Sequence, residues 1–301
     1  MKRTLVTGAS GLIGRHVAEA LAQRGFEVHG CSRAPARTPA ISMHQCDLLD
    51  SRATELLLRE IRPDTIVHCA WVTTHGTYWQ SPQNLEWLSA GVLLLRAARD
   101  AGMSRFVGVG SCAEYEAAGD MARHESRSPI APTTLYGSAK DALRLAAEKT
   151  AAEQGFQYAW ARVFMLYGAG EHPDRFIASL ARAIVSGQPA LMSSGTIVRD
   201  YLDARDVGTA IAMLAASPLA GVVNIASGHG ITLRAVGEKL AKIAGRPDLL
   251  VPGALPPRAG EPQTLVADVG RLRDELGFRP SIALDRGLAD VLDYWRVPGS
   301  A

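Results

Sequence analysis

The chain has 301 residues, of which 47% are hydrophobic and 21% are charged, with a formal net charge of +2 at pH 7. This balance is typical of a globular enzyme of one large domain, or of a large and a small one. So small a charge gives no reason to expect a nucleic acid or an anionic membrane as a partner. No stretch approaches the roughly 18 apolar residues of a membrane helix, and glycines interrupt the apolar start too soon for a signal peptide. We therefore expect a soluble, cytoplasmic protein.

The cysteines show no pattern of a disulfide framework or a metal site. Cys31, Cys46, Cys69 and Cys112 lack CxxC spacing and an adjacent histidine pattern. Reduced thiols are the better interpretation for a cytoplasmic protein. We predict no bound metal.

Along the first two-thirds of the chain, short apolar runs alternate with longer helical patterns, which predicts βαβ units on a parallel sheet. The predicted strands are Thr4–Thr7, Glu27–Cys31, Thr65–Ala70, Arg105–Val109, Gln157–Arg162 and Gly221–Asn224. The predicted helices include Gly14–Arg24, Asn84–Ala101 and Ser138–Gly155. After Gly168, proline and glycine become frequent. We predict an α/β fold with a Rossmann-type doubly wound parallel sheet in residues 1–165, to which residues 197–227 return, and a smaller substrate-binding lobe in residues 166–301.

A glycine-rich turn, Thr7–Gly14, follows the first strand and leads into the first helix. Gly8 and Gly11 allow a tight turn and the close approach of a pyrophosphate, while Gly14 lets the helix and strand pack closely. The helix N-terminus favours the negative charge. Between a strand and a helix, this pattern predicts a dinucleotide site. Its predicted contacts are Gly8, Ser10, Gly11, Leu12, Ile13 and Gly14.

The second predicted strand ends at Ser32 and Arg33, where an NAD-selecting fold would place an acidic residue on the ribose. A hydroxyl and a guanidinium suit a 2′-phosphate, so we predict NADP, with NAD possible and a solvated loop arginine as the alternative for Arg33. Asp47 and Leu48 are predicted to border the adenine, with a loop aspartate as the other interpretation of Asp47. Ala70 completes the predicted cofactor contacts.

Tyr136 and Lys140 are one helical turn apart, and Ser111 lies upstream of them. On a helix such residues share a face, so the Lys140 ammonium can lie beside the Tyr136 phenol. A nearby cation stabilises the phenolate and should lower the pKa of Tyr136. A phenol tuned in this way can pass a proton to or from an oxygen while hydride moves at carbon. We predict Ser111, Tyr136 and Lys140 as catalytic residues, with Tyr136 and Lys140 also contacting the cofactor.

With the glycine turn and these three residues in this order, the chain resembles the extended short-chain dehydrogenase/reductase family. Within it, the chain resembles the branch that acts on nucleotide-diphosphate sugars, in type the 4-ketoreductases. Further matches are Arg162 with Tyr167-Gly168, the run Arg199–Val207 and the run Arg258–Glu261. The resemblance implies a Rossmann domain with a C-terminal substrate lobe, and a homodimer formed through the helices Asn84–Ala101 and Ser138–Gly155.

The resemblance also implies roles for single residues. Ser111 would hold the sugar oxygen, Tyr136 would move the proton, and Lys140 would bind the nicotinamide ribose. Arg199 and Arg258 match positions that clamp the substrate pyrophosphate, which is reasonable because two guanidiniums can fork onto adjacent phosphates. Structural arginines paired with acidic neighbours are the alternative. Thr73 and Arg175 complete the predicted substrate contacts.

Other residues are less specific. Trp71, Thr74 and His75 follow a strand whose carboxyl end adjoins the cofactor cleft, so some of them are expected to shape the sugar pocket. His172 is expected either in that pocket or in a solvated loop. Met165 stands where many relatives have a substrate-contacting asparagine. Trp79 and Trp87 are predicted to be packing residues.

The residues after Ser111 argue against a sugar 4,6-dehydratase. Eliminating water needs a second acid/base pair, and Cys112 and Ala113 stand where such enzymes have carboxylates. Glu114 is displaced by one position. The GDP-fucose synthases of this family, which the chain resembles in length and cofactor, have an epimerising cysteine that would align with Ala113, one position after Cys112. A shift of one residue turns a side chain on extended backbone to the other face, so we predict Cys112 to be a buried packing thiol, with an acid/base group as the alternative.

We therefore predict the NADPH-dependent reduction of a keto group, at C4, on a nucleotide-diphosphate-linked deoxysugar. The first alternative is a nucleotide-sugar 4-epimerase with tightly bound NAD(P), which would use the same three residues. A reductase of a small ketone or aldehyde, and a non-catalytic NADP-binding protein, are further alternatives.

Overall fold

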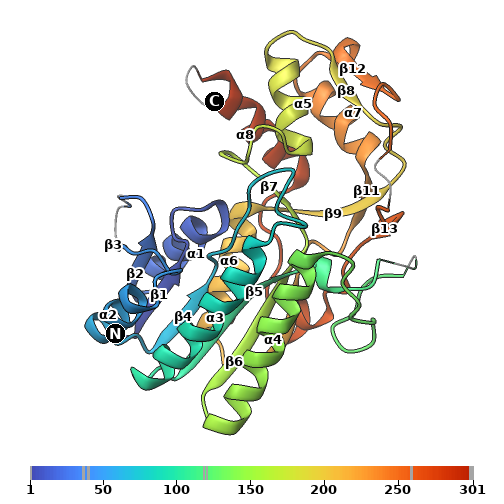
Figure 1. The fold of residues 1–301 in the computed structure, drawn as a ribbon. Coiled ribbons are helices and arrows are strands. Elements are labelled where there is room, and N and C mark those ends of the chain that lie inside the picture. Colours follow the sequence, from blue (N-terminus) through green and yellow to red (C-terminus); the bar gives the residue numbers. More distant parts are fainter. Residues whose placement is uncertain are drawn as a thin grey trace.

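The computed structural model describes residues 2–35, 38, 41–117, 119, 121–257 and 260–297. Its centre is a seven-stranded parallel sheet in the order β10-β6-β5-β4-β1-β2-β3 (Figure 1). The strands are β1 (Arg3–Thr7), β2 (Glu27–Ser32), β3 (Ser42–Gln45), β4 (Thr65–His68), β5 (Arg105–Ser111), β6 (Gln157–Val163) and β10 (Gly221–Ile225). The strand order reverses between β1 and β4, and ligands of such sheets bind beyond the carboxyl ends at this point.

Helices cover both faces of the sheet, which confirms the doubly wound prediction. One face carries α1 (Leu12–Gln23) and α6 (Ala204–Ala216), and the other carries α2 (Ser51–Ile61), α3 (Gln83–Asp100) and α4 (Leu135–Gln154). Neighbouring strand residues point into different cores: Val6 and Val107 pack under α1 and α6, Leu5 and Phe106 under the other three helices. A sheet buried on both faces needs such continuous apolar strands, so the sequence pattern and the architecture agree.

The later part of the chain forms two smaller sheets. In the first, β9 (Val198–Asp203) pairs with β7 (Met165–Tyr167), β11 (Gly230–Thr232) and β13 (Thr264–Leu265). In the second, β8 (Ala190–Met192) pairs with β12 (Leu250–Pro252). A short 3-10 helix, η1 (Cys112–Glu114), follows β5; a second one, η2 (Pro247–Leu249), precedes β12, and a π-helical turn, η3 (Arg271–Glu275), precedes α8.

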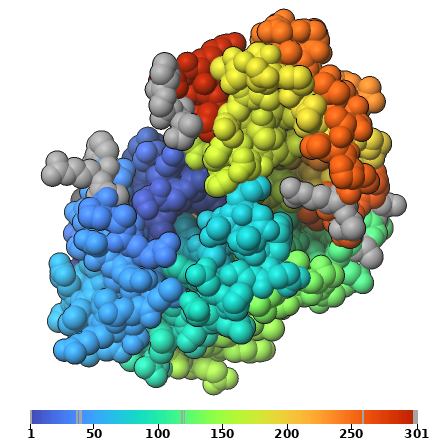
Figure 2. Space-filling view, turned by 45° about the horizontal axis from the view of Figure 1, so that its top comes forward, coloured from blue at the N-terminus to red at the C-terminus, as the bar shows by residue number. Residues whose placement is uncertain are grey.

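We call α5 (Phe176–Val185), β8, α7 (Leu233–Ile243), β12 and α8 (Leu284–Arg296) the C-terminal lobe. Its helices enclose a third core that includes Leu180, Leu240 and Leu288. The lobe lies beyond one end of the large sheet (Figure 1), and in the space-filling view its yellow and orange segments rest against blue and cyan segments of the sheet domain (Figure 2).

The Arg205 guanidinium, through its hydrogen bonds to Asp203 and Asp290, joins these parts of the molecule. Asp203 ends β9 and caps the N-terminus of α6, where its Oδ1 accepts a hydrogen bond from the Arg205 amide. The Arg205 guanidinium donates two hydrogen bonds to Asp203, at 2.8 and 2.7 Å, and one of 2.8 Å to Asp290 on α8. Bidentate pairs of this kind fix orientation as well as distance. The second sheet, the sheet domain and the lobe therefore meet at one joint.

All six predicted strands exist, although β4 ends at His68 rather than at Ala70. β3 and α2 were not predicted. Within residues 197–227, which were expected to return to the Rossmann domain, α6 and β10 belong to the large sheet and its helices whereas β9 pairs in the second sheet. The domain boundary at residue 165 stays a proposal. No helix in the described ranges combines the length and the hydropathy needed to cross a membrane.

Candidate active site

A cavity of about 460 Å³ lies at the carboxyl ends of the parallel strands. Its walls come from the turn after β1, the end of β2, the loop after β4, the end of β5, the first turns of α4 and the segment between β6 and α5. It therefore extends from the switch point of the large sheet to the edge of the C-terminal lobe. This is the position at which α/β folds of this topology bind ligands.

The glycine turn is built to hold an anion. Gly8 has φ of +65°, and a Cβ there would lie 2.9 Å from the Ala70 Cα, while a Cβ on Gly14 would collide with the Gly8 oxygen. Gly11 caps α1 without a side-chain hydrogen bond, so the first amides of the helix keep no side-chain partner. Such a helix N-terminus binds phosphate. The predicted contacts Gly8, Ser10, Gly11, Leu12, Ile13, Gly14 and Ala70 all line the cavity, and they fit a dinucleotide pyrophosphate.

The end of β2 forms the next part of the wall. Ser32, Arg33 and Leu48 line the cavity as predicted. The Ser32 hydroxyl donates a 2.7 Å hydrogen bond to the Ala34 oxygen, and Arg33 is exposed. Asp47 does not line the cavity, because its carboxylate turns back to accept a hydrogen bond from the Leu49 amide at 3.1 Å. The alternative interpretation of Asp47, a loop aspartate, describes it better.

Ser111 and Tyr136 meet in the wall of the cavity. Ser111 ends β5 and caps η1, and its side chain is a hydrogen-bond partner of Tyr136. Tyr136 lies in the first turn of α4, which Thr134 caps, and its amide donates to the Trp79 oxygen at 3.0 Å. Both predicted catalytic side chains line the cavity. A substrate oxygen between them would meet two hydroxyl groups.

The expected lowering of the Tyr136 pKa is wrong for this structure. Burial raises the pKa of Tyr136, the charges of Tyr78 and Glu114 act in the same direction, and the Ser111 hydrogen bond opposes the shift. The Lys140 ammonium does not turn to the phenol; it donates to the Val109 oxygen instead. At neutral pH Tyr136 is therefore a phenol that can donate a proton.

Lys140 lies in the cavity wall with only 3% of its surface exposed. Its Nζ donates a 2.8 Å hydrogen bond to the Val109 oxygen and lies 3.9 Å from the centre of the Trp71 ring. Burial lowers the pKa of Lys140 to about 7, although the charges of Glu114 and Cys69 act to raise it. The carbonyl and the ring face both favour the ammonium form, so these contacts oppose the effect of burial on the lysine.

An aromatic wall that the sequence did not reveal covers Tyr136. The rings of Tyr78 and Trp79 stack at 4.5 Å and meet the Tyr136 ring edge-on at 5.0 and 5.6 Å. Trp79, predicted as a packing residue, lines the cavity. Trp87 on α3 also lines it, but it belongs to a buried hydrophobic core as predicted. The place of Tyr78 and Trp79 after the carboxyl end of β4 was the available signal. Further lining residues are Trp71, Thr73, His75, Cys112, Phe164, Met165, Leu166 and His172, whereas Thr74 is not among them.

The predicted substrate arginines have different positions. Arg175 caps α5 and lines the cavity, 3.3 Å from Oε1 of buried Glu171. Arg199 does not line it: its Nη1 donates to the oxygens of Val198 and Pro262, and its Nη2 lies 3.6 Å from Glu261. The alternative of a structural arginine describes Arg199. Arg258 lies outside the described residues.

The electrostatic character of the cavity is one-sided. None of the described residues that line it is acidic, whereas three basic residues do line it: Arg33 directly after β2, Lys140 on α4 and Arg175 directly before α5. At the lobe side His75 and His172 stack with ring centres 4.9 Å apart. Such a cavity suits a ligand that carries several negative charges.

The candidate metal ligands lie elsewhere. His124, Glu125 and Asp268 bring ligand atoms within 4.8 Å of one another. Backbone amides donate to all three side chains, from Ser126, Asn224 and Gly270. These hydrogen bonds account for the arrangement, and all four cysteines are unpaired.

The chain is similar to known proteins along its whole length. Residues 4–226 match the sequence model of the NAD dependent epimerase/dehydratase family. A UDP-glucose 4-epimerase of Streptomyces lividans and a GDP-6-deoxy-D-mannose reductase of Pseudomonas aeruginosa are each 30% identical to the chain, covering 97% and 98% of it and 94% and 97% of their own lengths. The structure of a UDP-glucose 4-epimerase from Thermus thermophilus with NAD is similar with a TM-score of 0.88, at 27% identity, over 98% of this chain and 99% of that one.

Replacing Lys140 by methionine should stabilise the fold at acidic pH. Its folded-state pKa lies below that of an unfolded lysine, so the energetic cost of burying the cation is full below pH 7 and fades as the pH rises toward 10. The free energy of unfolding at pH 6 should rise by about 1–3 kcal/mol, as measured by urea denaturation, and the gain should shrink by pH 9.5. Lys149→Met, an exposed change on the same helix, is the control and should show no such dependence. An equal gain at both pH values would contradict the prediction.

Proposed function

Because the chain belongs to the NAD dependent epimerase/dehydratase family, we propose that it is an NADPH-dependent reductase. The substrate would be a keto group, at C4, on a nucleotide-diphosphate-linked deoxysugar. The observation that carries the proposal is the composition of the cavity wall. The described lining residues include no aspartate or glutamate, and they include three basic residues, Arg33, Lys140 and Arg175. NADPH and a nucleotide diphosphate are both polyanions, and the two would bind side by side in this one cavity.

The cofactor preference rests on the end of β2. No acidic side chain among the described residues lines the cavity near Ser32 to accept from a ribose 2′-hydroxyl, and the exposed Arg33 can move to a 2′-phosphate. A reductase must exchange NADP for NADPH in every turnover, whereas an epimerase retains its cofactor. A preference for NADPH therefore supports the reductase over the epimerase.

The chemistry follows from the central side chains. NADPH held by the glycine turn would supply the hydride for the carbonyl carbon. Tyr136, held as a phenol, donates its proton to the oxygen of that carbonyl, and the Ser111 hydroxyl hydrogen-bonds the same oxygen. The buried Lys140 ammonium adds positive charge beside the position at which negative charge develops.

Two features narrow the substrate. The aromatic wall of Tyr78 and Trp79 offers apolar surface next to Tyr136, which suits a sugar that has a methyl group in place of a C6 hydroxymethyl. Glu114 is buried away from the cavity, so no carboxylate pair is available among the described lining residues for the elimination of water. Both features favour a deoxysugar that another enzyme has already dehydrated.

The second candidate function is a nucleotide-sugar 4-epimerase. The similarity to UDP-glucose 4-epimerases, one of which binds NAD, favours it. It would use Ser111, Tyr136 and Lys140 in both directions. The absence of acidic lining residues among the described positions and the exposed arginine at the end of β2 are what favour the reductase.

The first test is the net oxidation of NADPH. With an excess of NADPH and a panel of UDP-, GDP-, CDP- and dTDP-linked 4-keto-6-deoxyhexoses, at least one substrate should cause a steady loss of the absorbance of the reduced nicotinamide. Tyr136→Phe should lower kcat by a factor of about 10²–10⁴, because proton donation is lost. Interconversion of UDP-glucose and UDP-galactose without net oxidation would instead establish the epimerase, and an unchanged Tyr136→Phe enzyme would refute the proposed chemistry.

The second test addresses the 2′-phosphate. Arg33→Ala should weaken NADPH binding about 10- to 100-fold, the value of a charge-assisted hydrogen bond, and leave NADH binding unchanged in fluorescence titrations. Arg59→Ala, which removes an exposed arginine from α2, is the matched control. An equal loss for both dinucleotides would show that Arg33 does not read the phosphate.

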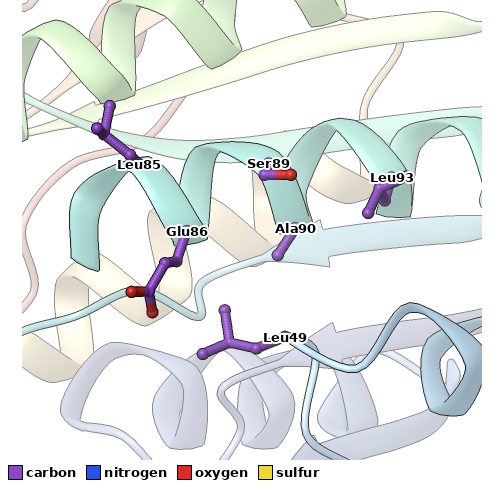
Figure 3. A pocket seen from close by; sticks show the side chains of 6 residues that line it. All are labelled: Leu49, Leu85, Glu86, Ser89, Ala90 and Leu93. Carbon is purple, nitrogen blue, oxygen red and sulfur yellow. The ribbon is translucent and has the colours of Figure 1, made fainter. Parts of the chain in front are cut away.

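We also propose a homodimer through α3 and α4. Leu85, Val92 and Leu145 are 55%, 43% and 45% exposed on these helices. Beside them a groove of about 510 Å³ runs between α3 and Leu49, with Leu93 and Ala90 on its wall (Figure 3). Exposed apolar side chains at helical spacing are typical of a face that a partner covers.

Sedimentation should therefore show a dimer, and Val92→Glu should convert it to a monomer because a charge would be buried without a partner. Leu191→Glu on the lobe, at a side chain of similar exposure, should leave the dimer intact. A wild-type monomer at micromolar concentration would contradict this part of the proposal.

A further inference from the structure

Glu114 is a fully buried carboxylate directly behind the catalytic serine. It ends η1 and has no exposed surface. Its Oε1 accepts a 2.7 Å hydrogen bond from the Ser111 amide, and its Oε2 accepts one of 2.8 Å from Nε of Arg162 on β6. The Trp160 indole donates to both oxygens at 3.0 and 3.2 Å. These hydrogen bonds together hold the carboxylate in one orientation.

The surrounding residues are shaped around this carboxylate. A Cβ on Gly110 would collide with its Oε1 and with the Trp160 indole nitrogen. Arg162 is 1% exposed and its guanidinium lies 4.4 Å from the centre of the Tyr115 ring. Apolar residues of similar volume often replace such a buried ion pair without loss of stability. Stability alone therefore does not explain a negative charge at this position.

The charge acts on the catalytic groups across the end of β5. It raises the pKa of Lys140, against the effect of burial, and it also raises that of Tyr136. Arg162 is its direct partner, and the other titratable groups that it influences are Cys112 and Tyr158. Lys140 is in turn faced by Cys69 and His68 from the end of β4. A Cys69 thiolate would also favour the ammonium, but burial raises the pKa of Cys69 to about 12, so the thiol is protonated at neutral pH and Glu114 is the larger influence.

We propose that Glu114 is a positioning residue, which fixes the backbone of Ser111 through its hydrogen bond to the Ser111 amide and places a buried negative charge behind the end of β5, where Ser111, Tyr136 and Lys140 meet. The inference rests on the proposed function, because it gives these groups their roles. The inference also deepens the proposed function. A negative charge favours the protonated forms of Lys140 and Tyr136, and a protonated Tyr136 can donate its proton to a carbonyl oxygen, as reduction requires. The carboxylate itself does not line the cavity and does not touch substrate.

The test is a titration of Lys140, followed by ¹³C NMR in protein labelled at lysine Cε. The chain has five lysines, and Lys140→Met identifies the resonance of interest. Glu114→Gln keeps the shape and the acceptor for the Ser111 amide but removes the charge. The Lys140 midpoint should then fall by about one pH unit. Glu114→Asp keeps the charge and should leave the midpoint unchanged even where the turnover number falls.

The controls separate charge from folding. Glu148→Gln removes an exposed charge from the same helix as Lys140 and should not move the midpoint. If Glu114→Gln does not fold, because it leaves Arg162 buried without a partner, the double variant Glu114→Gln/Arg162→Met removes both charges. It should still lower the midpoint, but by less, because a positive charge is lost together with the negative one. A midpoint that does not fall in either folded variant overturns the inference. The titration needs no substrate, so a failure of the proposed function would not affect its outcome.

Discussion

The burial of a lysine ammonium at the carboxyl end of β5 is the constraint on which the site depends. Water is largely excluded from Lys140, so its charge relies on the Val109 carbonyl, the Trp71 ring and the carboxylate behind Ser111. Each comes from a different part of the large sheet or its loops. The catalytic groups are therefore held by the sheet itself, and the energetic cost of the buried cation is part of what makes the site reactive.

The two ends of the cavity have separate origins. The phosphate-binding turn and Arg33 come from the first two strands, whereas Arg175 and His172 come from the segment that leads into the lobe. The cofactor half needs only local geometry, a glycine turn and an uncapped helix. The other end of the cavity needs a second folded unit placed against it, because Arg175 and His172 lie in the segment that leads into the C-terminal lobe.

The sequence allowed the fold and the glycine turn to be predicted because both depend on local features, strand periodicity and glycine spacing. It also identified Ser111, Tyr136 and Lys140 as neighbours. It did not reveal side-chain direction. Spacing alone could not show that Lys140 bonds to the Val109 oxygen rather than to the phenol. Nor could it show that Asp47 accepts a hydrogen bond from its own loop, or that the Trp79 ring packs against Tyr136. These outcomes are decided by burial and by competing hydrogen bonds from distant segments.

The hydrogen bonds of Arg205 to Asp203 and Asp290 have a consequence for which parts of the sequence can vary. It joins the end of β9, the start of α6 and the lobe helix α8, and α6 packs on α1, whose N-terminus faces the glycine turn. The lobe thus takes its orientation from the dinucleotide-binding half through a handful of residues. Loops elsewhere in the lobe can therefore change in sequence without altering how the lobe is oriented, as long as the hydrogen bonds of Arg205 to Asp203 and Asp290 are kept.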